Sequence, residues 1–262
     1  MSDNKLRVVI MGCGGSGGVP YAGNVWLDCD PTNPKNHRTR PSIYLEKGDT
    51  RVVIDTGPDF RTQINRVGIT ADQLLSGVIY THGHMDHVMG LDDLRTFWHR
   101  GGHVPVPIHA TPETFKRLKH VFDYTFEQQS EEYPQTVMPY ELPDGNLTIG
   151  DLEFIHFPQI HGHMETRGFR IGDFAYSTDV NDFPEESLNK LKGLKVWVVG
   201  TMGNETGTFN HAGLVKVREW IDYLKPEMTY LTHLNAHADY DALCKIMPDH
   251  IRPAYDGMEI LL

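Results

Sequence analysis

The segment 81–87 gathers side chains that bind divalent metal ions. Three imidazoles and one carboxylate occur there within six residues: His82, His84, Asp86 and His87. Zinc, manganese and iron accept imidazole and carboxylate donors. An apolar strand predicted over residues 77–81 ends directly before this cluster. The pattern predicts a metal site at the end of a strand, and a polar loop with incidental histidines is the alternative.

Three further donors stand at the ends of predicted strands downstream. His161 lies a few residues after the apolar segment 152–157. Asp179 directly follows the segment 174–178, and His233 directly follows the segment 228–232. His163 lies two residues beyond His161 and is a less favoured alternative to it. Any one of them alone is more often a hydrogen-bonded structural residue. Together with the first cluster they supply enough ligands for two metal ions.

The glycine-rich segment 12–20 matches the dinucleotide-binding pattern Gly-x-Gly-x-x-Gly after a strand. That pattern needs a helix to begin at once, with its N-terminus facing a diphosphate. Here Gly18, Val19 and Pro20 interrupt any helix, and a polar, proline-containing loop follows. We therefore expect a loop that borders an active site, where glycine lets the backbone approach a ligand closely.

The hydrophobic patterning predicts alternating strands and helices. One α/β domain spanning residues 1–262, with a layered αββα arrangement, accommodates them. The expected strands cover 6–11, 42–46, 51–55, 77–81, 105–110, 152–157, 168–171, 174–177, 196–199, 228–231 and a segment near the C-terminus, and the expected helices cover 60–67, 111–122 and 211–224.

Composition limits the partners of the chain. Hydrophobic residues make up 39% of it, enough for a packed core, and its net charge of -11 argues against a broad, non-specific hold on extended nucleic acid. No apolar stretch is long enough to span a bilayer or to form the core of a signal peptide. The three cysteines are scattered and do not resemble a disulfide framework. We expect a cytoplasmic protein without a membrane partner.

The order of these motifs resembles the metallo-β-lactamase superfamily over essentially the whole chain. Within it the chain is similar to the phosphoribosyl cyclic phosphodiesterase family of the carbon–phosphorus lyase pathway. The shared segments are 14–20, 81–91, 210–211, 232–233 and 256–260. The resemblance implies an αββα sandwich of two mixed sheets flanked by helices.

The same resemblance implies a site with two divalent ions, zinc or manganese. One ion would be held by His82, His84 and His161, the other by Asp86, His87 and His233, with Asp179 bridging them. A hydroxide shared by the two metals would attack the substrate. Asp86 counts among the catalytic residues as well, and His211 would protonate the leaving oxygen. Alternatively, Asn210 and His211 merely cap a helix that begins near Ala212.

The expected reaction is hydrolysis of small phosphodiesters such as cyclic phosphates or nucleotides. A thioester hydrolase of the glyoxalase II kind, a tRNA 3′-end nuclease and a non-catalytic binding module remain alternatives, and a homodimer remains open. Guanidinium groups pair with phosphate in a bidentate manner. The candidate substrate anchors are five arginines: Arg38, Arg40, Arg61, Arg95 and Arg100. Arg40 and Arg95 are favoured among them, although an arginine of this kind more commonly lies on the solvated surface.

The chain departs from the resembling family in one respect. Those proteins carry a cysteine-rich zinc clip after the glycine-rich loop. Here the corresponding positions are Asn24, Trp26 and Cys29, with His237 as a fourth. One cysteine and one histidine hold zinc poorly, so no such clip is predicted.

Overall fold

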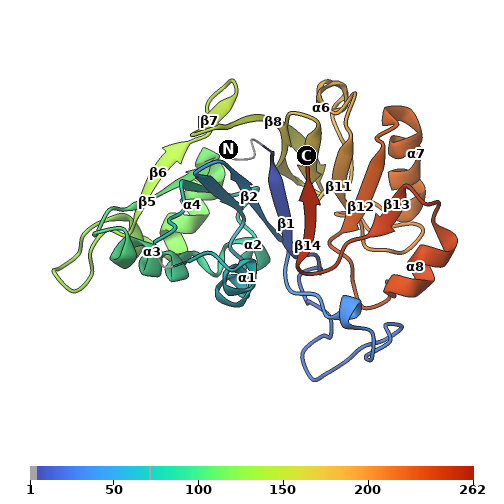
Figure 1. Cartoon of the computed structure of the whole chain (residues 1–262), viewed down its shortest axis with the longest axis horizontal. Coiled ribbons are helices and arrows are strands. Elements are labelled where there is room, and N and C mark those ends of the chain that lie inside the picture. Colours follow the sequence, from blue (N-terminus) through green and yellow to red (C-terminus); the bar gives the residue numbers. More distant parts are fainter. Residues whose placement is uncertain (1–4, 71) are drawn as a thin grey trace.

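Two seven-stranded sheets packed face to face form the centre of the molecule. The structure is a computed structural model that describes residues 5–70 and 72–262. Figure 1 shows helices α1 to α4 on the outer side of one sheet and α6 to α8 on the outer side of the other. This arrangement is the αββα sandwich that the sequence predicts.

The first sheet has the order β14-β1-β2-β3-β4-β5-β6. Strands β14, β1, β2 and β3 pair antiparallel, whereas β3 to β6 pair parallel, so the sheet is mixed. Its strands are β1 (Arg7–Gly12), β2 (Ser42–Lys47), β3 (Thr50–Ile54), β4 (Gly77–Ile79), β5 (Val106–Ala110), β6 (Val137–Glu141) and β14 (Met258–Leu261).

The second sheet has the order β13-β12-β11-β10-β9-β8-β7. It is mixed too, since β7 to β10 pair antiparallel and β10 to β13 pair parallel. Its strands are β7 (Leu147–Ile149), β8 (Leu152–His161), β9 (Met164–Ile171), β10 (Phe174–Ser177), β11 (Val196–Gly200), β12 (Met228–Thr232) and β13 (Ile251–Pro253).

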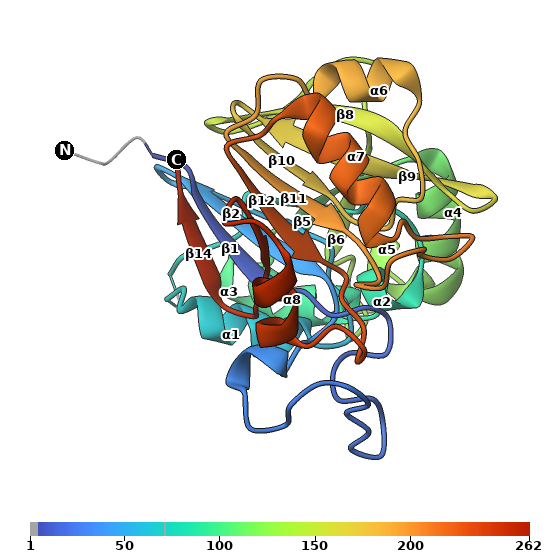
Figure 2. The same cartoon turned by 90° about the vertical axis from the view of Figure 1, so that its right-hand side faces the viewer.

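The helices cover the outer faces of the two sheets. The first sheet carries α1 (Phe60–Val67), α2 (Met85–Val88), α3 (Arg95–Arg100), α4 (Pro112–Val121), α5 (Asp123–Phe126) and the short 3₁₀ turn η2 (Leu91–Leu94). The second carries α6 (Glu185–Lys190), α7 (Leu214–Leu224) and α8 (Tyr240–Ile246), and a further 3₁₀ turn, η1 (Pro34–Asn36), lies in the loop after β1. Figure 2 shows that loop projecting from one end of the sandwich.

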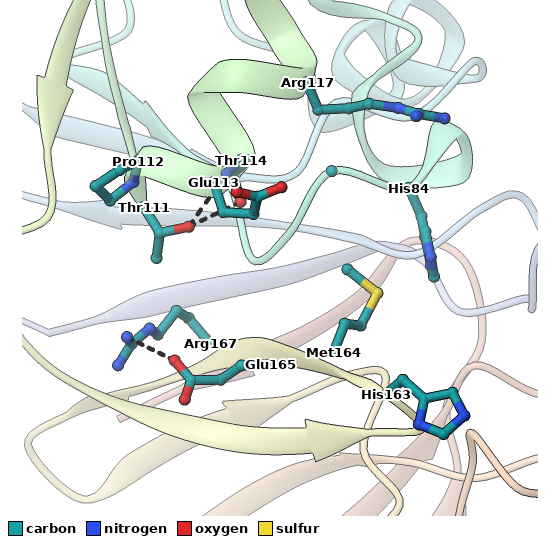
Figure 3. A pocket seen from close by; sticks show the side chains of 11 residues that line it. His84, Thr111, Pro112, Glu113, Thr114, Arg117, His163, Met164, Glu165 and Arg167 are labelled. Carbon is teal, nitrogen blue, oxygen red and sulfur yellow. Dashed lines mark hydrogen bonds and ion pairs between the residues drawn. The ribbon is translucent and has the colours of Figure 1, made fainter.

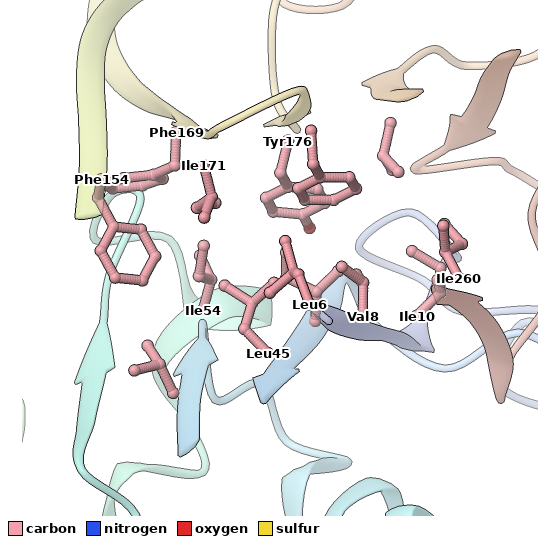
Figure 4. Packing of buried hydrophobic residues seen from close by; sticks show 14 of the residues in the cluster. Leu6, Val8, Ile10, Leu45, Ile54, Phe154, Phe169, Ile171, Tyr176 and Ile260 are labelled. Carbon is pink, nitrogen blue, oxygen red and sulfur yellow. The ribbon is translucent and has the colours of Figure 1, made fainter. Parts of the chain in front are cut away.

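Central strands such as β1, β3, β10 and β11 are buried on both faces, and their alternate residues pack in different layers. In β1, Val8 and Ile10 pack between the two sheets, whereas Val9 and Met11 pack under the helices. Figure 4 shows the layer between the sheets, where Leu45 and Ile54 of the first sheet face Ile171 and Tyr176 of the second. Burial of both faces holds the strands, and therefore their ends, in fixed positions.

Strands β3 and β4 run parallel, as do β10, β11 and β12, so their carboxyl ends meet at one edge of each sheet. Asp55, Asp179 and His233 follow β3, β10 and β12, and each has a left-handed backbone, with φ of 66°, 49° and 61°. Non-glycine residues seldom adopt this conformation, and it concentrates at functional sites. These three residues therefore indicate a functional site at this edge of the sandwich.

Three predicted boundaries were wrong by more than two residues. The helix expected over 211–224 begins at Leu214, because residues 207–213 form a bent segment closed by a bridge between Gly207 and Ala212, in which the backbones of Gly207 and Gly213 pack too closely for a side chain at either position. Strand β8 extends to His161 and not just to Phe157. Strand β9, expected to begin at Gly168, begins at Met164. The two strands pair with each other as far as His161 and Met164, beyond the end of the apolar pattern.

Candidate metal centre

The histidine cluster lies in the segment that connects β4 of the first sheet to α2 and in α2 itself. Strand β4 leads through Tyr80 and Thr81 to His82, and His84 stands directly before α2, on which Asp86 and His87 lie. The amide of His87 bonds to the carbonyl of His84, which closes a helical turn. A loop followed by one helical turn therefore directs all four side chains to one place.

Two groups of four side chains have potential ligand atoms within 4.8 Å of one another. One consists of His82, His84, His161 and Asp179, and the other of Asp86, His87, Asp179 and His233. These are the seven residues predicted from the sequence, sorted into the same two sets with Asp179 in both. His163 belongs to neither group within the described residues.

The carboxylate of Asp179 lies at the centre of four imidazoles. Its Oδ1 is 3.9 Å from Nε2 of His82, 3.8 Å from Nε2 of His161 and 3.3 Å from Nε2 of His233. Its Oδ2 is 3.0 Å from Nε2 of His87. Asp179 is 1% exposed, and Oδ2 also accepts a hydrogen bond from Thr178. A carboxylate in this position can serve two ions at once.

The Nδ1 atoms of two imidazoles are engaged away from the centre. His87 Nδ1 lies 2.6 Å from Oδ2 of Asp55, and His161 Nδ1 lies 2.8 Å from the carbonyl oxygen of Asn210. Asp55 is fully buried and also accepts bonds from the amide and hydroxyl of Thr81, whose hydroxyl contacts His82 Nδ1. Such outer contacts fix which nitrogen a ring presents to a metal.

The atoms that face the centre fit a metal ion. Nε2 of His82, His87 and His233 is buried and makes no hydrogen bond to any residue that the structure describes, although oxygens of Asp179 lie 3.0 Å from the His87 atom and 3.3 Å from the His233 atom. A buried polar atom without a partner carries a free-energy cost that a bound cation would remove. Imidazole nitrogens together with carboxylate oxygens suit zinc, manganese and related ions. The two groups are therefore suited to binding metal ions.

Electrostatics favour the protonation states that ligands need, with one exception. Burial lowers the pKa of His82 well below 6.5, and for Asp179 the nearby His233 and His87 outweigh burial and hold its pKa well below the usual value. For His87 burial lowers the pKa, but Asp179 and Asp55 outweigh it and raise the pKa well above 6.5. A cation here must therefore displace a proton from His87.

His211 lies against the ligands without belonging to either group. Its ring stacks on His233 at 4.5 Å between centroids and meets His161 edge-on at 4.6 Å. Burial and the neighbouring His233 lower the pKa of His211 to about 3. The ring is thus placed beside the centre and is uncharged in the free protein at neutral pH.

The glycine-rich segment borders this centre, as expected. Gly14 and Leu234 form a bridge, and Gly15 packs directly against the ring of His233. Gly15, Ser16 and Gly17 line a small pocket together with His211 and His233. No helix begins in this segment, which agrees with the rejection of a dinucleotide-binding loop.

Both arginines that the sequence suggested as anchors already have acidic partners. Arg40 pairs with Asp59 at 3.2 Å, and Arg95 pairs with Asp92 at 3.4 Å while lying over the ring of Tyr124. Their role in binding substrate stays a prediction.

For Arg38 the expectation of solvated surface was wrong. It is 2% exposed and donates to the carbonyl of Asn235 and to the side chain of Asn36. Its guanidinium also lies 3.9 Å from the sulfur of Cys29. His237 pairs instead with Asp28, and within residues 5–70 and 72–262 neither Cys29 nor His237 belongs to a metal-binding group. A buried arginine therefore organises this loop.

Sequence reasoning missed Asp55 and Arg117. Asp55 was taken only as the end of a strand, although its position directly after a β-branched run matched that of Asp179. Arg117, on α4, lines a cleft next to His84, and no pattern in the sequence singled it out from other helix-surface residues.

Three comparisons place the chain among known proteins. The model of the β-lactamase superfamily domain matches residues 50–234. A diphosphatase of the PhnP family, whose crystal structure is known, has 31% identical residues and a TM-score of 0.88, with 98% of this chain and 97% of that chain covered.

An octanoyltransferase of Porphyromonas gingivalis is 30% identical over 98% of this chain and 52% of its own length. A ribonuclease Z of Methanococcus maripaludis is 26% identical over 62% of this chain and 50% of its own length. The chain thus spans about half the length of these curated relatives. The family model matches most of the chain, and the fold is similar to that of the diphosphatase over nearly the whole of both chains. The protein therefore belongs to the β-lactamase superfamily and has the metallo-β-lactamase fold.

Proposed function

We propose that this protein is a two-metal phosphodiesterase that acts on small organic phosphates, such as cyclic phosphates or nucleotides. The observation that carries the proposal is the shared Asp179, placed among four imidazole Nε2 atoms with Asp86 beside them. The likeness to a diphosphatase over nearly the whole of both chains supports phosphorus as the atom attacked.

In this proposal two divalent ions, zinc or manganese, are held by the two groups of ligands. When bound, they supply a hydroxide at neutral pH and disperse the charge that develops on the phosphoryl group. Asp86 would act as a ligand, since its Oδ2 lies 3.4 Å from Nε2 of His87 and 3.8 Å from Nε2 of His233. Asp55 and the Asn210 carbonyl keep the imidazoles of His87 and His161 correctly turned.

His211 is the proposed proton donor to the leaving oxygen. It is the imidazole beside the centre that is not needed as a ligand. Because its pKa is lowered to about 3, the free ring is neutral, and the negative charge of a bound phosphodiester is what would favour its protonation. The departing alkoxide then takes the proton.

A second candidate is hydrolysis of acyl thioesters. It is favoured by the octanoyltransferase relative, which matches along almost the whole chain but extends to about twice the matched length. The same ligands could activate water toward an acyl carbon. The portion of that relative outside the match could equally hold the acyl-transfer activity.

A panel of substrates distinguishes these functions. Metal-loaded protein is assayed with bis(p-nitrophenyl) phosphate, p-nitrophenyl phosphate, a 2′,3′-cyclic nucleotide and an octanoyl thioester. We expect the diesters to be hydrolysed faster than the monoester and the thioester. Much faster turnover of the thioester than of every diester would replace the proposal with the second candidate.

The described helices include none that is long and apolar enough to cross a membrane. A cytoplasmic location, a small substrate and the absence of a hold on extended nucleic acid remain proposals. A homodimer is neither required nor opposed by the site, since both ligand groups are complete within one chain.

A further inference from the structure

A cleft of about 790 Å³ opens beside His84 and is larger than a phosphodiester group requires. One wall is formed by Gly83 and the first turns of α4, and the other by the hairpin of β8 and β9. Clefts of this volume hold ligands the size of a nucleoside or larger. Because His84 belongs to the first group of metal ligands, the cleft leads directly away from the reacting centre.

The charged groups in this cleft are unequally paired. Arg167 is bound to Glu165 at 2.7 Å. Arg117 makes no hydrogen bond or ion pair within the part of the chain that the structure describes. Glu113 stands one turn before it on α4, at a spacing that commonly gives ion pairs, yet no bond joins the two. Arg117 is therefore a free cation in a cleft that also contains two carboxylates.

The stem of Arg117 lies over the metal-binding loop itself. A Cβ atom built on Gly83 would lie 3.1 Å from both Cβ and Cγ of Arg117. Figure 3 shows Arg117 at the same end of the cleft as His84 and His163, with the ion pair of Glu165 and Arg167 at the other end. Because Gly83 has no side chain, the aliphatic part of Arg117 can pack closely over the loop.

We propose that Arg117 is the specificity-determining residue of this cleft and binds a second phosphate of the substrate. This rests on the proposed phosphodiesterase activity and narrows it: the preferred substrates are diesters whose nucleoside-sized portion carries a further phosphate group. A guanidinium can engage phosphate through two parallel hydrogen bonds, which suits it to this task.

Two chromogenic diesters test this directly. Thymidine 5′-(p-nitrophenyl phosphate) and its 3′-phosphorylated form release the same leaving group and differ only in the second phosphate. We expect kcat/KM for metal-loaded protein to be roughly ten- to hundredfold higher with the second phosphate, as one charge-assisted contact provides. In Arg117→Ala this ratio falls to about one, whereas Arg117→Lys retains part of it. The ratio cancels any loss common to both substrates.

Lys116→Ala is the matched control, because Lys116 is exposed on the same helix and does not line the cleft. It should leave the ratio as in the unaltered protein. A ratio near one in the unaltered protein, or a high ratio that survives Arg117→Ala, overturns the assignment of Arg117 while leaving the phosphodiesterase proposal intact.

Calorimetric titration separates the two proposals. Adenosine 3′,5′-bisphosphate and adenosine 5′-phosphate contain no diester, so their binding does not depend on turnover. We expect the bisphosphate to bind metal-loaded protein more tightly than the monophosphate, and this difference to vanish in Arg117→Ala. If every diester stays uncleaved but the binding difference depends on Arg117, the phosphodiesterase proposal fails and the phosphate site stands. Equal binding of the two nucleotides contradicts the phosphate site.

Discussion

Asp55 determines which nitrogen His87 turns toward the centre. Its buried carboxylate binds both the His87 ring and Thr81, and through Thr81 it reaches His82. One outer residue thus positions one ligand from each group. This is a common arrangement around metals, where an outer carboxylate fixes the orientation of an imidazole and increases its basicity.

Replacing Asp55 with Asn is expected to weaken metal binding roughly ten- to hundredfold, since the carboxylate that holds His87 is lost. Competition with a chromogenic chelator measures the affinities. The matched control is Asp256→Asn, which removes a nearly buried carboxylate that binds Thr39 and the amide of Cys13 but no ligand. The control should lower stability and leave metal affinity unchanged. Equal metal affinity in Asp55→Asn and the unaltered protein would remove Asp55 from its assigned role.

Replacing His211 with Ala should leave metal content unchanged, because His211 lies outside both ligand groups. The loss of rate should be about 10² to 10⁴ for diesters with alkyl or ribose leaving groups, which need a proton. It should be far smaller for p-nitrophenyl diesters, whose phenolate leaves readily. Equal losses for both substrate types would indicate a role in positioning. A loss of bound metal would show that His211 is a ligand.

At the scale of elements, segments with a clear apolar pattern were predictable and segments without one were not. The helix expected over 60–67 is α1 as found, because its apolar spacing and the glycine after it are local signals. Strands β7 and β13 were not predicted, since each has only three residues. Strand β6 was not predicted either, and Pro139 interrupts its apolar pattern. Helix α8 had a usable signal: Asp239 caps it through the amide of Ala242.

The grouping of the seven donor residues could be predicted from the sequence, whereas the residues that support them could not. The ligand residues have side chains whose chemistry is visible in the sequence, and strand ends at one edge bring them together. Asp55 stands after a strand as Asp179 does, but the partners that give it a role, Thr81 and His87, lie far along the chain. Nothing in the sequence separates Arg117 from other residues on helix surfaces. The same holds for Arg38, whose burial arises from loops that meet only in the folded protein.

Arg38 is expected to stabilise the loop after β1. In Arg38→Met the buried carbonyl of Asn235 and the side chain of Asn36 lose their donor, at a cost of about 2–5 kcal/mol in the free energy of unfolding. Urea denaturation measures this cost. Arg61→Met, which alters an exposed arginine on α1, should change stability by less than about 0.5 kcal/mol. Equal changes in the free energy of unfolding for the two substitutions would mean that the buried hydrogen bonds of Arg38 do not stabilise the fold.

His109 on β5 should make the fold sensitive to acid. Its ring stacks on Tyr140, and burial lowers the pKa from 6.5 to about 4. As the pH falls below 6.5 the unfolded chain takes up the proton first, so stability decreases between about pH 6.5 and pH 4.

The variant His109→Gln lacks this contribution. Its unfolding free energy should therefore fall less steeply than that of the unaltered protein over this range, with a constant difference between the two above pH 7. Denaturant titrations at a series of pH values supply the comparison. Parallel curves throughout would show that His109 is not responsible.

At the scale of the whole molecule, an acidic protein is proposed to act on anionic substrates. The net charge of -11 opposes their approach, and two bound divalent cations would reverse the sign of the field locally. The single-domain organisation over residues 1–262 and the oligomeric state stay predictions. The parallel strands of both sheets end on the same centre, so the two halves of the sandwich are joined through Asp179 and His87.

The rate of bis(p-nitrophenyl) phosphate hydrolysis, measured while zinc or manganese is added to metal-free protein, tests the central claim most directly. Both ligand groups must be filled for the proposed chemistry, because one shared carboxylate serves both ions. The rate is therefore expected to rise with added metal and to level off at two ions per chain. A plateau at one ion per chain, or no hydrolysis at any metal content, would contradict a two-metal phosphodiesterase.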